Sequence, residues 1–386
     1  MTMKAAVVGG GIGGLVTAVA LRQAGVDVRV FEQASAVGTA GAGIQLAPNA
    51  TRVLDALGLL PAIRRVAVEP TEFDFRRWDD GRVLSTTPLA GAIADTYGAP
   101  YLHVHRGDLI AILAEALPVE VGARCVDVVP GDRGAELLLA GGRREQADLV
   151  VGADGIHSLV RRSVLGAEDA RFTGHVAFRG LIPAERVAGL GLAHTATVRM
   201  GPGRHCVHYF VSAGRLLNVV CVIEETSWTR ESWTDRGDPA EVRAAFADWD
   251  PVVRAIVDAL DAPLKWALFD REPIPRWSKG AVTLLGDACH PMLPYGAQGA
   301  AQAIEDAAVL AACLRDDADV PAALARYEAL RHDRTARVQA ISRGNATRFH
   351  LPDGPAQQAR DAAIAASNGL TPDLDWLYGS DIFTAA

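Results

Sequence analysis

The chain has 386 residues, 49% of them hydrophobic, and a formal net charge of −8. Such a chain can bury a large core, so we expect a globular protein of two domains or of one elaborated domain. The acidic balance argues against nucleic acid as a partner. The sequence also lacks an apolar run of membrane-spanning length and an export signal. Five scattered cysteines without a CxxC motif indicate reduced thiols and a cytoplasmic location.

The N-terminal segment has the pattern of a βαβ unit. Lys4 to Val8, with the apolar run Ala5 to Val8, has the pattern of a buried strand, and Val26 to Phe31 alternates as a second strand. Between them, about Ile12 to Ala24, apolar residues recur at helical spacing. Strand, helix and strand within so few residues predict one unit of a parallel sheet.

A glycine turn joins the first strand to the helix. Gly9, Gly11 and Gly14 satisfy the GxGxxG pattern, and Glu32 follows the second strand. In dinucleotide-binding proteins such glycines allow a tight turn, close approach of a pyrophosphate to the helix N-terminus and close helix packing, while the acid binds ribose hydroxyls. The turn therefore predicts a dinucleotide site, and at this point it leaves NAD and FAD both open.

The middle of the chain changes from helical to strand patterns separated by glycine and proline. The segments are Thr71 to Trp78, His175 to Ile182, Thr195 to Met200, His205 to Val211 and Leu216 to Ile223. They predict a mixed or antiparallel sheet. A further buried strand, Ala281 to Leu285, precedes two long alanine-rich helices, Ala301 to Arg315 and Ala322 to Gly344.

We therefore predict an α/β fold in which a Rossmann-type nucleotide-binding domain is interleaved with a mixed β-sheet substrate domain and followed by a C-terminal helical segment. The nucleotide-binding domain is expected in three parts, 1–70, 101–172 and 271–350, the last including the long helices. The substrate domain is expected in 71–100 and 173–270. Residues 351–386 have few periodic cues and are expected to form a surface tail.

Two later motifs separate FAD from NAD. Residues 148–158, Asp-Leu-Val-Val-Gly-Ala-Asp-Gly-Ile-His-Ser, and residues 277–291, which contain Gly286-Asp287, each run a buried strand into a Gly/Asp turn. Both resemble signatures of flavoprotein hydroxylases. An ordinary strand-to-helix turn explains one such motif. It explains poorly three motifs in this order, namely the glycine turn and the two later ones. We therefore expect FAD, held noncovalently because no attachment motif is present.

The resemblance extends over nearly the whole chain to the group A flavin monooxygenases, the para-hydroxybenzoate hydroxylase superfamily. Within it, residues 41–49, 97–109, 155–158 and 290–307 look most similar to the branch of 6-hydroxynicotinate 3-monooxygenase and the salicylate hydroxylases. The resemblance implies a single-component enzyme, a monomer or homodimer, that uses O2 and NADH or NADPH as transient co-substrate. It would hydroxylate a small phenolic or hydroxypyridine substrate through a flavin C4a-hydroperoxide, with or without loss of CO2.

The same resemblance implies the residues that bind the cofactor. Beside the glycine turn and Glu32, they lie near the ribityl chain, the pyrophosphate and the flavin ring. A glycine loop that opens a helix presents N–H groups and a positive dipole end where a reduced flavin carries negative charge. The expected cofactor residues are Gly9, Gly11, Gly13, Gly14, Glu32, Gln33, Gln45, Arg106, Asp154, Asp287, Pro294, Gly299 and Ala300.

Candidate catalytic residues come from the segment Arg204 to Val211. Side chains alternate along a strand, so His205, Val207 and Tyr209 share one face and His208 lies on the other. His205 and Tyr209 are suited to deprotonating or orienting a ring hydroxyl, although amphipathic residues on a strand at a domain seam would give the same pattern.

The substrate residues expected from the resemblance are Gln45, Tyr209, Pro294 and Tyr295. Gln45 and Tyr295 are neutral where the hydroxynicotinate enzymes have histidines, so salicylate-like acids and neutral phenols stay open.

Other readings of these residues fit less well. His103 and His105 share a strand face but lack further zinc ligands nearby, so no metal site is expected. A flavin oxidase or a reductase of polyprenyl type shares the glycine turn and the Gly-Asp motif without hydroxylating anything, and it remains the alternative. A non-catalytic dinucleotide-fold protein has no reason to keep Asp154, Asp287 and Pro294 together.

Overall fold

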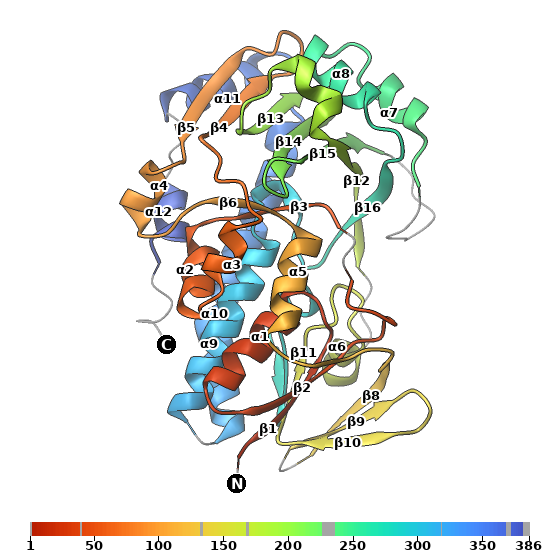
Figure 1. Ribbon diagram of the computed structural model, residues 1–386, viewed down its shortest axis with the longest axis vertical. Coiled ribbons are helices and arrows are strands. Elements are labelled where there is room, and N and C mark those ends of the chain that lie inside the picture. The colour runs from red at the N-terminus through yellow and green to blue at the C-terminus, as the bar shows by residue number, and fades with distance from the viewer. Residues whose placement is uncertain are drawn as a thin grey trace.

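The computed structural model describes residues 2–38, 41–131, 134–166, 170–225, 236–317, 319–367 and 372–380. Two large sheets organise the chain, and the N-terminus lies beside the six-stranded one (Figure 1). The six-stranded sheet has the order β17 (Ser278–Lys279), β18 (Val282–Leu284), β11 (Leu149–Gly152), β1 (Lys4–Val8), β2 (Asp27–Phe31) and β7 (Val119–Glu120). The seven-stranded sheet has the order β16 (Leu264–Asp270), β12 (Arg171–Pro183), β15 (Leu216–Glu224), β14 (Arg204–Val211), β13 (Ala196–Gly201), β4 (Glu72–Arg77) and β5 (Val83–Pro88).

The six-stranded sheet contains the expected βαβ unit. β1 pairs in parallel with β2 and with β11, and β11 pairs in parallel with β18. Four of the five residues of β1 are buried, because a central parallel strand is covered on both faces. Helix α1 (Ile12–Gln23) connects β1 to β2 and packs against α9 (Gly299–Asp316). The predicted Rossmann-type core is thus confirmed.

The seven-stranded sheet is mixed, as expected, because β13 pairs in parallel with β4 and antiparallel with β14. Helices α7 (Pro239–Ala245) and α8 (Pro251–Asp258) cover one face through a separate apolar core. On the other face, Tyr295 and Phe349 pack against strand residues such as Val198 and Met200. We call this second face the inner face; it is the one that faces the Pro291–Gly299 loop.

Helix α10 (Val320–Phe349) extends from one sheet to the other. Near its start, Glu328 accepts hydrogen bonds from the backbone N–H groups of Trp277 and Ser278, which adjoin the six-stranded sheet. At its end, Phe349 packs edge-on to Phe75 of β4 at 5.9 Å between ring centroids. The helix therefore fixes the two sheets relative to each other.

Smaller elements complete the fold. Two small sheets order as β10 (Arg144–Ala147), β9 (Ala135–Leu139), β8 (Cys125–Pro130), and β3 (Gly43–Leu46) with β6 (Leu102–His105). The remaining helices before the C-terminal region are α2 (Pro48–Ala56), α3 (Leu60–Arg64), α4 (Ala92–Tyr97), α5 (Arg106–Glu115), α6 (Leu159–Leu165) and the 3₁₀ turns η1 (Ala184–Leu190), η2 (Gly286–Ala288) and η3 (Pro294–Gly296). None of the helices in the described part of the chain is long and apolar enough to cross a membrane.

The surface tail expected over 351–386 contains two helices in its described residues. Helix α11 (Pro355–Ala366) buries Gln357, Arg360, Asp361 and Ile364, and helix α12 (Pro372–Tyr378) follows it. Tyr378 packs edge-on to Tyr97 at 5.6 Å between ring centroids. Because most of the buried residues of α11 are polar, a search for apolar residues at helical spacing does not detect this helix. Residues 368–371 and 381–386 lie outside the described residues.

Candidate active site

The glycine turn requires glycine at two positions for steric reasons. Gly9 has φ +112°, and a Cβ there would lie 2.3 Å from the carbonyl oxygen of Ala153. A Cβ on Gly14 would lie 2.0 Å from the carbonyl oxygen of Gly9. Gly11, in contrast, has no neighbouring atom within 4 Å of an added Cβ. The turn is therefore closely packed on its sheet side and open at Gly11.

The first turn of α1 is suited to an anion. Its N-cap, Gly11, provides no side-chain cap, and the turn contains no acidic residue. Its N–H groups and the positive end of the helix dipole are thus available to a pyrophosphate. Glu32 accepts hydrogen bonds from the backbone N–H of Gly10 at 2.7 Å and of Ala34 at 2.8 Å, which directs its carboxylate toward the turn. The adjacent Gln33 is exposed.

Arg106 and Asp287 lie near enough for the charge of each to influence the pKa of the other. Burial lowers the pKa of Arg106, and the charges of Glu32 and Asp287 partly offset that effect. Burial raises the pKa of Asp287, while His290 and Arg106 lower it. The Asp287 side chain itself is exposed, so its carboxylate is free to accept hydroxyl groups although protein surrounds it at longer range.

The start of α9 lies beside Asp287. A Cβ on Gly299 would be 3.9 Å from the Asp287 Oδ1, and the first turn, which includes Ala300, has neither a side-chain cap nor an acid. Just before it, Ala297 has φ +52°, a left-handed conformation that alanine adopts at a cost. Open N–H groups at two helix starts, with an acid beside each, fit the pyrophosphate, ribose, ribityl and flavin parts of FAD.

The side chain of Asp154, an expected cofactor residue, is hydrogen-bonded within its own turn. Both carboxylate oxygens are used within its own turn, by Ser158 Oγ and by the backbone N–H groups of Leu159 and Val160. The side chain therefore caps the start of α6, which contains Leu159 and Val160. Its backbone nitrogen still lies 3.1 Å from the position of a Cβ on Gly9, so the Asp154 turn adjoins the glycine turn.

His205 and Tyr209 lie on the inner face, as strand alternation predicts. The ring centroid of His205 is 5.1 Å from that of Tyr295, and the Tyr209 centroid is 4.4 Å from that of His103. His208 is on the opposite face, where its Nε2 contacts Arg199 Nη1 at 2.6 Å.

Two other expected substrate residues are held close by. Gln45, on β3, accepts a hydrogen bond from the Tyr101 hydroxyl at 2.6 Å, and the half-buried Pro294 precedes Tyr295 in η3.

Between the two tyrosines, the inner face is partly open. Val207, Val220 and Arg179 lie side by side across three strands, because Val207 pairs with Val220 and Val220 pairs with Arg179. All three are half-buried, whereas the residues next to Val207 and Val220 along their strands are mostly buried. We call these three residues the floor. It offers two neighbouring apolar side chains with one guanidinium beside them.

Arg179 was not identified from the sequence, and its environment is unusual. Its guanidinium lies over the Trp266 ring, 4.6 Å from the centroid, and within the described residues its buried Nε has no hydrogen-bond partner. Burial lowers the pKa of Arg179, and Tyr209 and Tyr295 partly offset that effect. A cation held in this way, with no ion pair in the described part of the chain, is suited to an anionic group.

Two histidines that contact His205 and Tyr295, His350 and His175, were also not identified from the sequence. His205 Nδ1 lies 2.7 Å from His350 Nε2, and His350 Nδ1 lies 3.2 Å from Glu224 Oε1. Tyr295 Oη lies 2.8 Å from His175 Nδ1. Burial lowers the pKa of His350 to about 3 and that of His205 well below its ordinary value. These rings are therefore neutral at working pH.

The fold and this site define a flavoprotein with a Rossmann-type core, and comparisons with known proteins identify the family. The FAD binding domain family model matches residues 2–342. The chain is 43% identical over 380 residues to a 3-amino-4-hydroxybenzoate 2-monooxygenase of Streptomyces platensis (97% of this chain, 96% of the relative).

Two further matches lead to the same family. The chain is 41% identical over 351 residues to a 6-hydroxynicotinate 3-monooxygenase of Pseudomonas fluorescens (89% and 91%). The structure of a salicylate hydroxylase substrate complex superposes with a TM-score of 0.85 at 26% identity, covering 99% of this chain and 97% of that one. The chain belongs to the FAD-dependent aromatic monooxygenases, which confirms the resemblance.

Proposed function

We propose that this enzyme hydroxylates a small aromatic acid, a ring that carries a carboxylate together with a hydroxyl or amino group. The observation that carries the proposal is Arg179, a partly buried guanidinium whose Nε has no partner within the described residues, at the edge of an apolar floor. A ring lying on Val207 and Val220 would place its carboxylate at Arg179. Its hydroxyl or amino group would then face Tyr209 or His205.

The names of the similar proteins support this substrate class. Aminohydroxybenzoate, hydroxynicotinate and salicylate are all rings with a carboxylate and a hydroxyl group. An oxygen or nitrogen substituent raises the electron density of the ring carbons ortho and para to it, which makes them the targets of electrophilic oxygen. We infer that this chain uses the same combination of an anchoring acid and an activating group.

We further propose the residues that hold the cofactor. Glu32 is positioned for the ribose, the open Gly11 end of α1 for the pyrophosphate, Asp287 for the ribityl hydroxyls and the start of α9 for the flavin ring. Arg106 interacts electrostatically with both acids. When bound, FAD would supply the oxygen chemistry, with NADH or NADPH as reductant. In the net reaction, one substrate, O2, NAD(P)H and a proton give the hydroxylated product, water and NAD(P)⁺.

The protein's own part is to orient the ring and to handle its proton. Tyr209 stays protonated because burial raises its pKa, so its hydroxyl can donate a hydrogen bond to a substrate oxygen. His205 is neutral and can accept the proton of a ring hydroxyl. The free state of all five cysteines fits a reducing cytoplasm, where we expect the enzyme to act as a monomer or homodimer.

The test is a substrate panel with matched pairs that differ only in the carboxylate. 3-Amino-4-hydroxybenzoate is paired with 2-aminophenol, 6-hydroxynicotinate with 2-hydroxypyridine, and salicylate with phenol. The acids are expected to stimulate NAD(P)H oxidation and to give a hydroxylated product identified by mass. If only the carboxylate-free partners are hydroxylated, or if none of the six is, the proposed substrate class is wrong.

Arg179→Gln tests the anchoring residue. A lost charge-assisted hydrogen bond costs about 1.5–3 kcal/mol, so KM for the best acid should rise roughly 10- to 150-fold, with little change for the carboxylate-free partner. Arg171→Gln is the control, because Arg171 lies on the same strand but is mostly exposed. An equal effect of Arg179→Gln on both members of a pair contradicts carboxylate binding.

A further inference from the structure

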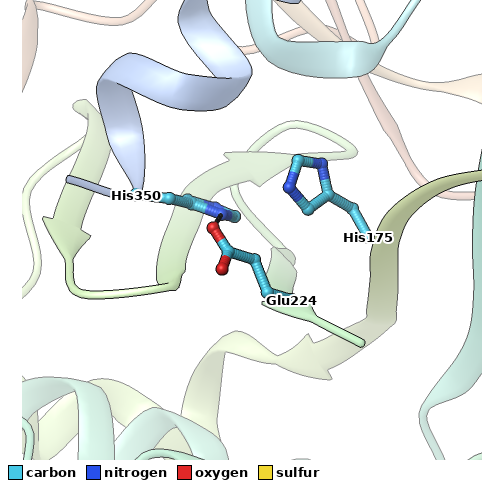
Figure 2. A group of neighbouring side chains, drawn as sticks. All are labelled: His175, Glu224 and His350. Carbon is cyan, nitrogen blue, oxygen red and sulfur yellow. Dashed lines mark hydrogen bonds and ion pairs between the residues drawn. The ribbon is translucent and has the colours of Figure 1, made fainter. Parts of the chain in front are cut away.

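A continuous line of hydrogen-bonding side chains leads from His205 to the surface. His205 on β14 contacts His350, which follows α10, and His350 contacts Glu224, the last residue of β15. Figure 2 shows the His350 ring directed at the Glu224 carboxylate, with His175 of β12 facing the same space. The His350 side chain is 1% exposed, whereas that of Glu224 is 55% exposed. The line therefore begins at a buried catalytic candidate and ends in water.

The carboxylate fixes where the ring protons lie. An ionised Glu224 only accepts hydrogen bonds, so His350 Nδ1–H must be the donor to it. The Nε2 of a neutral His350 is then an acceptor, and His205 Nδ1–H donates to it. This arrangement leaves the proton-free nitrogen of His205 at Nε2, on the side of the ring away from His350. An assignment of this kind follows from the network itself.

We propose that Glu224 and His350 form a proton relay that connects His205, and through it the substrate hydroxyl, with solvent. Deprotonation of a bound phenol moves its proton to His205 Nε2. The Nδ1 proton of His205 then passes to His350 Nε2, and the Nδ1 proton of His350 passes to Glu224 and water. One proton leaves the phenol and one reaches solvent, so no further reactant is needed. This inference rests on the proposed function and adds Glu224 and His350 as positioning residues.

The surroundings of the relay favour release of the proton over its storage. Burial is the main reason why the pKa values of His205, His350 and His175 are all lowered, and the histidines also disfavour each other's charge. Within the described part of the chain, Tyr295 also faces these rings; burial raises its pKa, and the charge of Arg179 partly offsets that effect. Among the described residues, the carboxylate that contacts these rings is that of Glu224, at the exposed end.

The experiment measures ionisation of a bound phenol without turnover. FAD-loaded enzyme is mixed with 4-hydroxy-3-nitrobenzoate, a carboxylated phenol whose phenolate absorbs at longer wavelength than the phenol. The fraction of phenolate is followed by difference spectra against pH. Wild type, Glu224→Gln, His350→Gln and the control Glu225→Gln are compared, with FAD retention and melting temperature as checks on folding. Glu225 is the neighbouring carboxylate outside the relay.

The relay predicts that Glu224→Gln raises the apparent pKa of the bound phenol and slows the hydroxylation of the best substrate roughly 10- to 100-fold, part of what a positioned base contributes. Glu225→Gln should behave like wild type. If Glu224→Gln binds the probe with an unchanged ionisation curve and turns over normally, the relay is wrong while the proposed function stands. A wild-type enzyme that does not bind the probe contradicts both. A stoichiometric metal ion that is lost with His350→Gln also overturns the relay, because the donor atoms of His175, Glu224 and His350 all lie within 4.8 Å of one another.

Discussion

Arg331 of α10 donates a hydrogen bond from its Nε to Asp306 of α9 at 2.7 Å, and both side chains are almost fully buried. The same carboxylate accepts hydrogen bonds from the backbone N–H of Gly286 at 3.0 Å and from His290 Nε2 at 2.6 Å. Arg331 also donates to Glu305 at 2.5 Å. A single buried network therefore joins two long helices to the turn that presents Asp287.

Arg331→Met should destabilise the protein by about 3–5 kcal/mol, because it leaves buried carboxylates without their cation. The change in unfolding free energy is measured by urea denaturation of the FAD-loaded enzyme. Arg326→Met on the same helix is the control; its ion pair with Asp316 is exposed, so a cost below about 1 kcal/mol is expected. Similar costs for both variants contradict the importance of the network.

Asp306 should make the free energy of unfolding depend on pH in the acidic range. Burial alone would raise its pKa, but His290 and Arg331 outweigh burial and lower it from 3.8 to about 2. A carboxyl group whose pKa is lowered in the folded state stabilises the protein above its unfolded pKa, and this contribution is lost as the pH falls toward the folded value. The advantage of wild type over Asp306→Asn in unfolding free energy should therefore shrink by about 2 kcal/mol between about pH 5 and about pH 2. A pH-independent difference contradicts this expectation.

Two substitutions in the glycine turn should distinguish its role in folding from its role in cofactor binding. Gly14→Ala places a methyl group 2.0 Å from the Gly9 carbonyl oxygen, so the apoprotein should lose several kcal/mol of stability or fail to fold. Gly11→Ala meets no atom of the chain within 4 Å and should leave the apoprotein as stable as wild type. It should nevertheless weaken FAD binding, because the added methyl would occupy the approach of the pyrophosphate. Thermal melts of the apoproteins and fluorescence titration with FAD measure the two effects; tight FAD binding by Gly11→Ala would place the pyrophosphate elsewhere.

Asp287→Ala should weaken FAD retention with little effect on the fold. The exposed carboxylate lies at the start of α9 and has no hydrogen bond of its own to stabilise the chain in the described structure. Loss of a charged acceptor for ribityl hydroxyls corresponds to about 1.5–3 kcal/mol, which is roughly a 10- to 150-fold higher Kd for FAD. Equilibrium dialysis gives the value, and an unchanged Kd would remove Asp287 from the cofactor site.

The sequence predicts those parts of the molecule that depend on patterns among neighbouring residues. The strand, the glycine turn and the helix up to Gln23 depend on neighbouring residues, and so does the alternation that separates His205 from His208. Arg179 and Glu224 were not predicted, because their importance depends on strand register. Arg179 lies near Val207 because both residues pair with Val220 of β15. His350 follows a helix far along the chain from His205, and no local pattern relates the two.

Helix α11 shows a second reason for failure. Its buried positions, Gln357, Arg360, Asp361 and Ile364, have helical spacing, and Pro355 is a common residue in a first turn. Three of the four buried residues are polar, however, and they satisfy one another through bonds such as Arg360 to Asp361 at 2.9 Å. A search for apolar periodicity passes over such a helix, whereas the proline and the spacing together would have found it.

The position of Arg179 also predicts whether the substrate keeps its carboxyl group during hydroxylation. The similar proteins differ on it: a 2-monooxygenase of 3-amino-4-hydroxybenzoate attacks a carbon next to the acid, whereas a 3-monooxygenase of a nicotinate attacks the carbon that bears it. Attack at the carboxylated carbon is favoured when an activating hydroxyl is ortho or para to it, and the ring then becomes aromatic again by losing CO2 in place of a proton. Arg179 at the edge of the floor would hold the carboxylate to one side, so that the neighbouring carbon lies over Val207 and Val220. We therefore expect an aminohydroxybenzoate to keep its carboxyl group. With the carboxyl carbon labelled, the label should remain in the hydroxylated acid, and Arg179→Gln should release part of it as the ring shifts. Release in step with NAD(P)H oxidation by the wild-type enzyme would instead indicate attack at the carboxylated carbon.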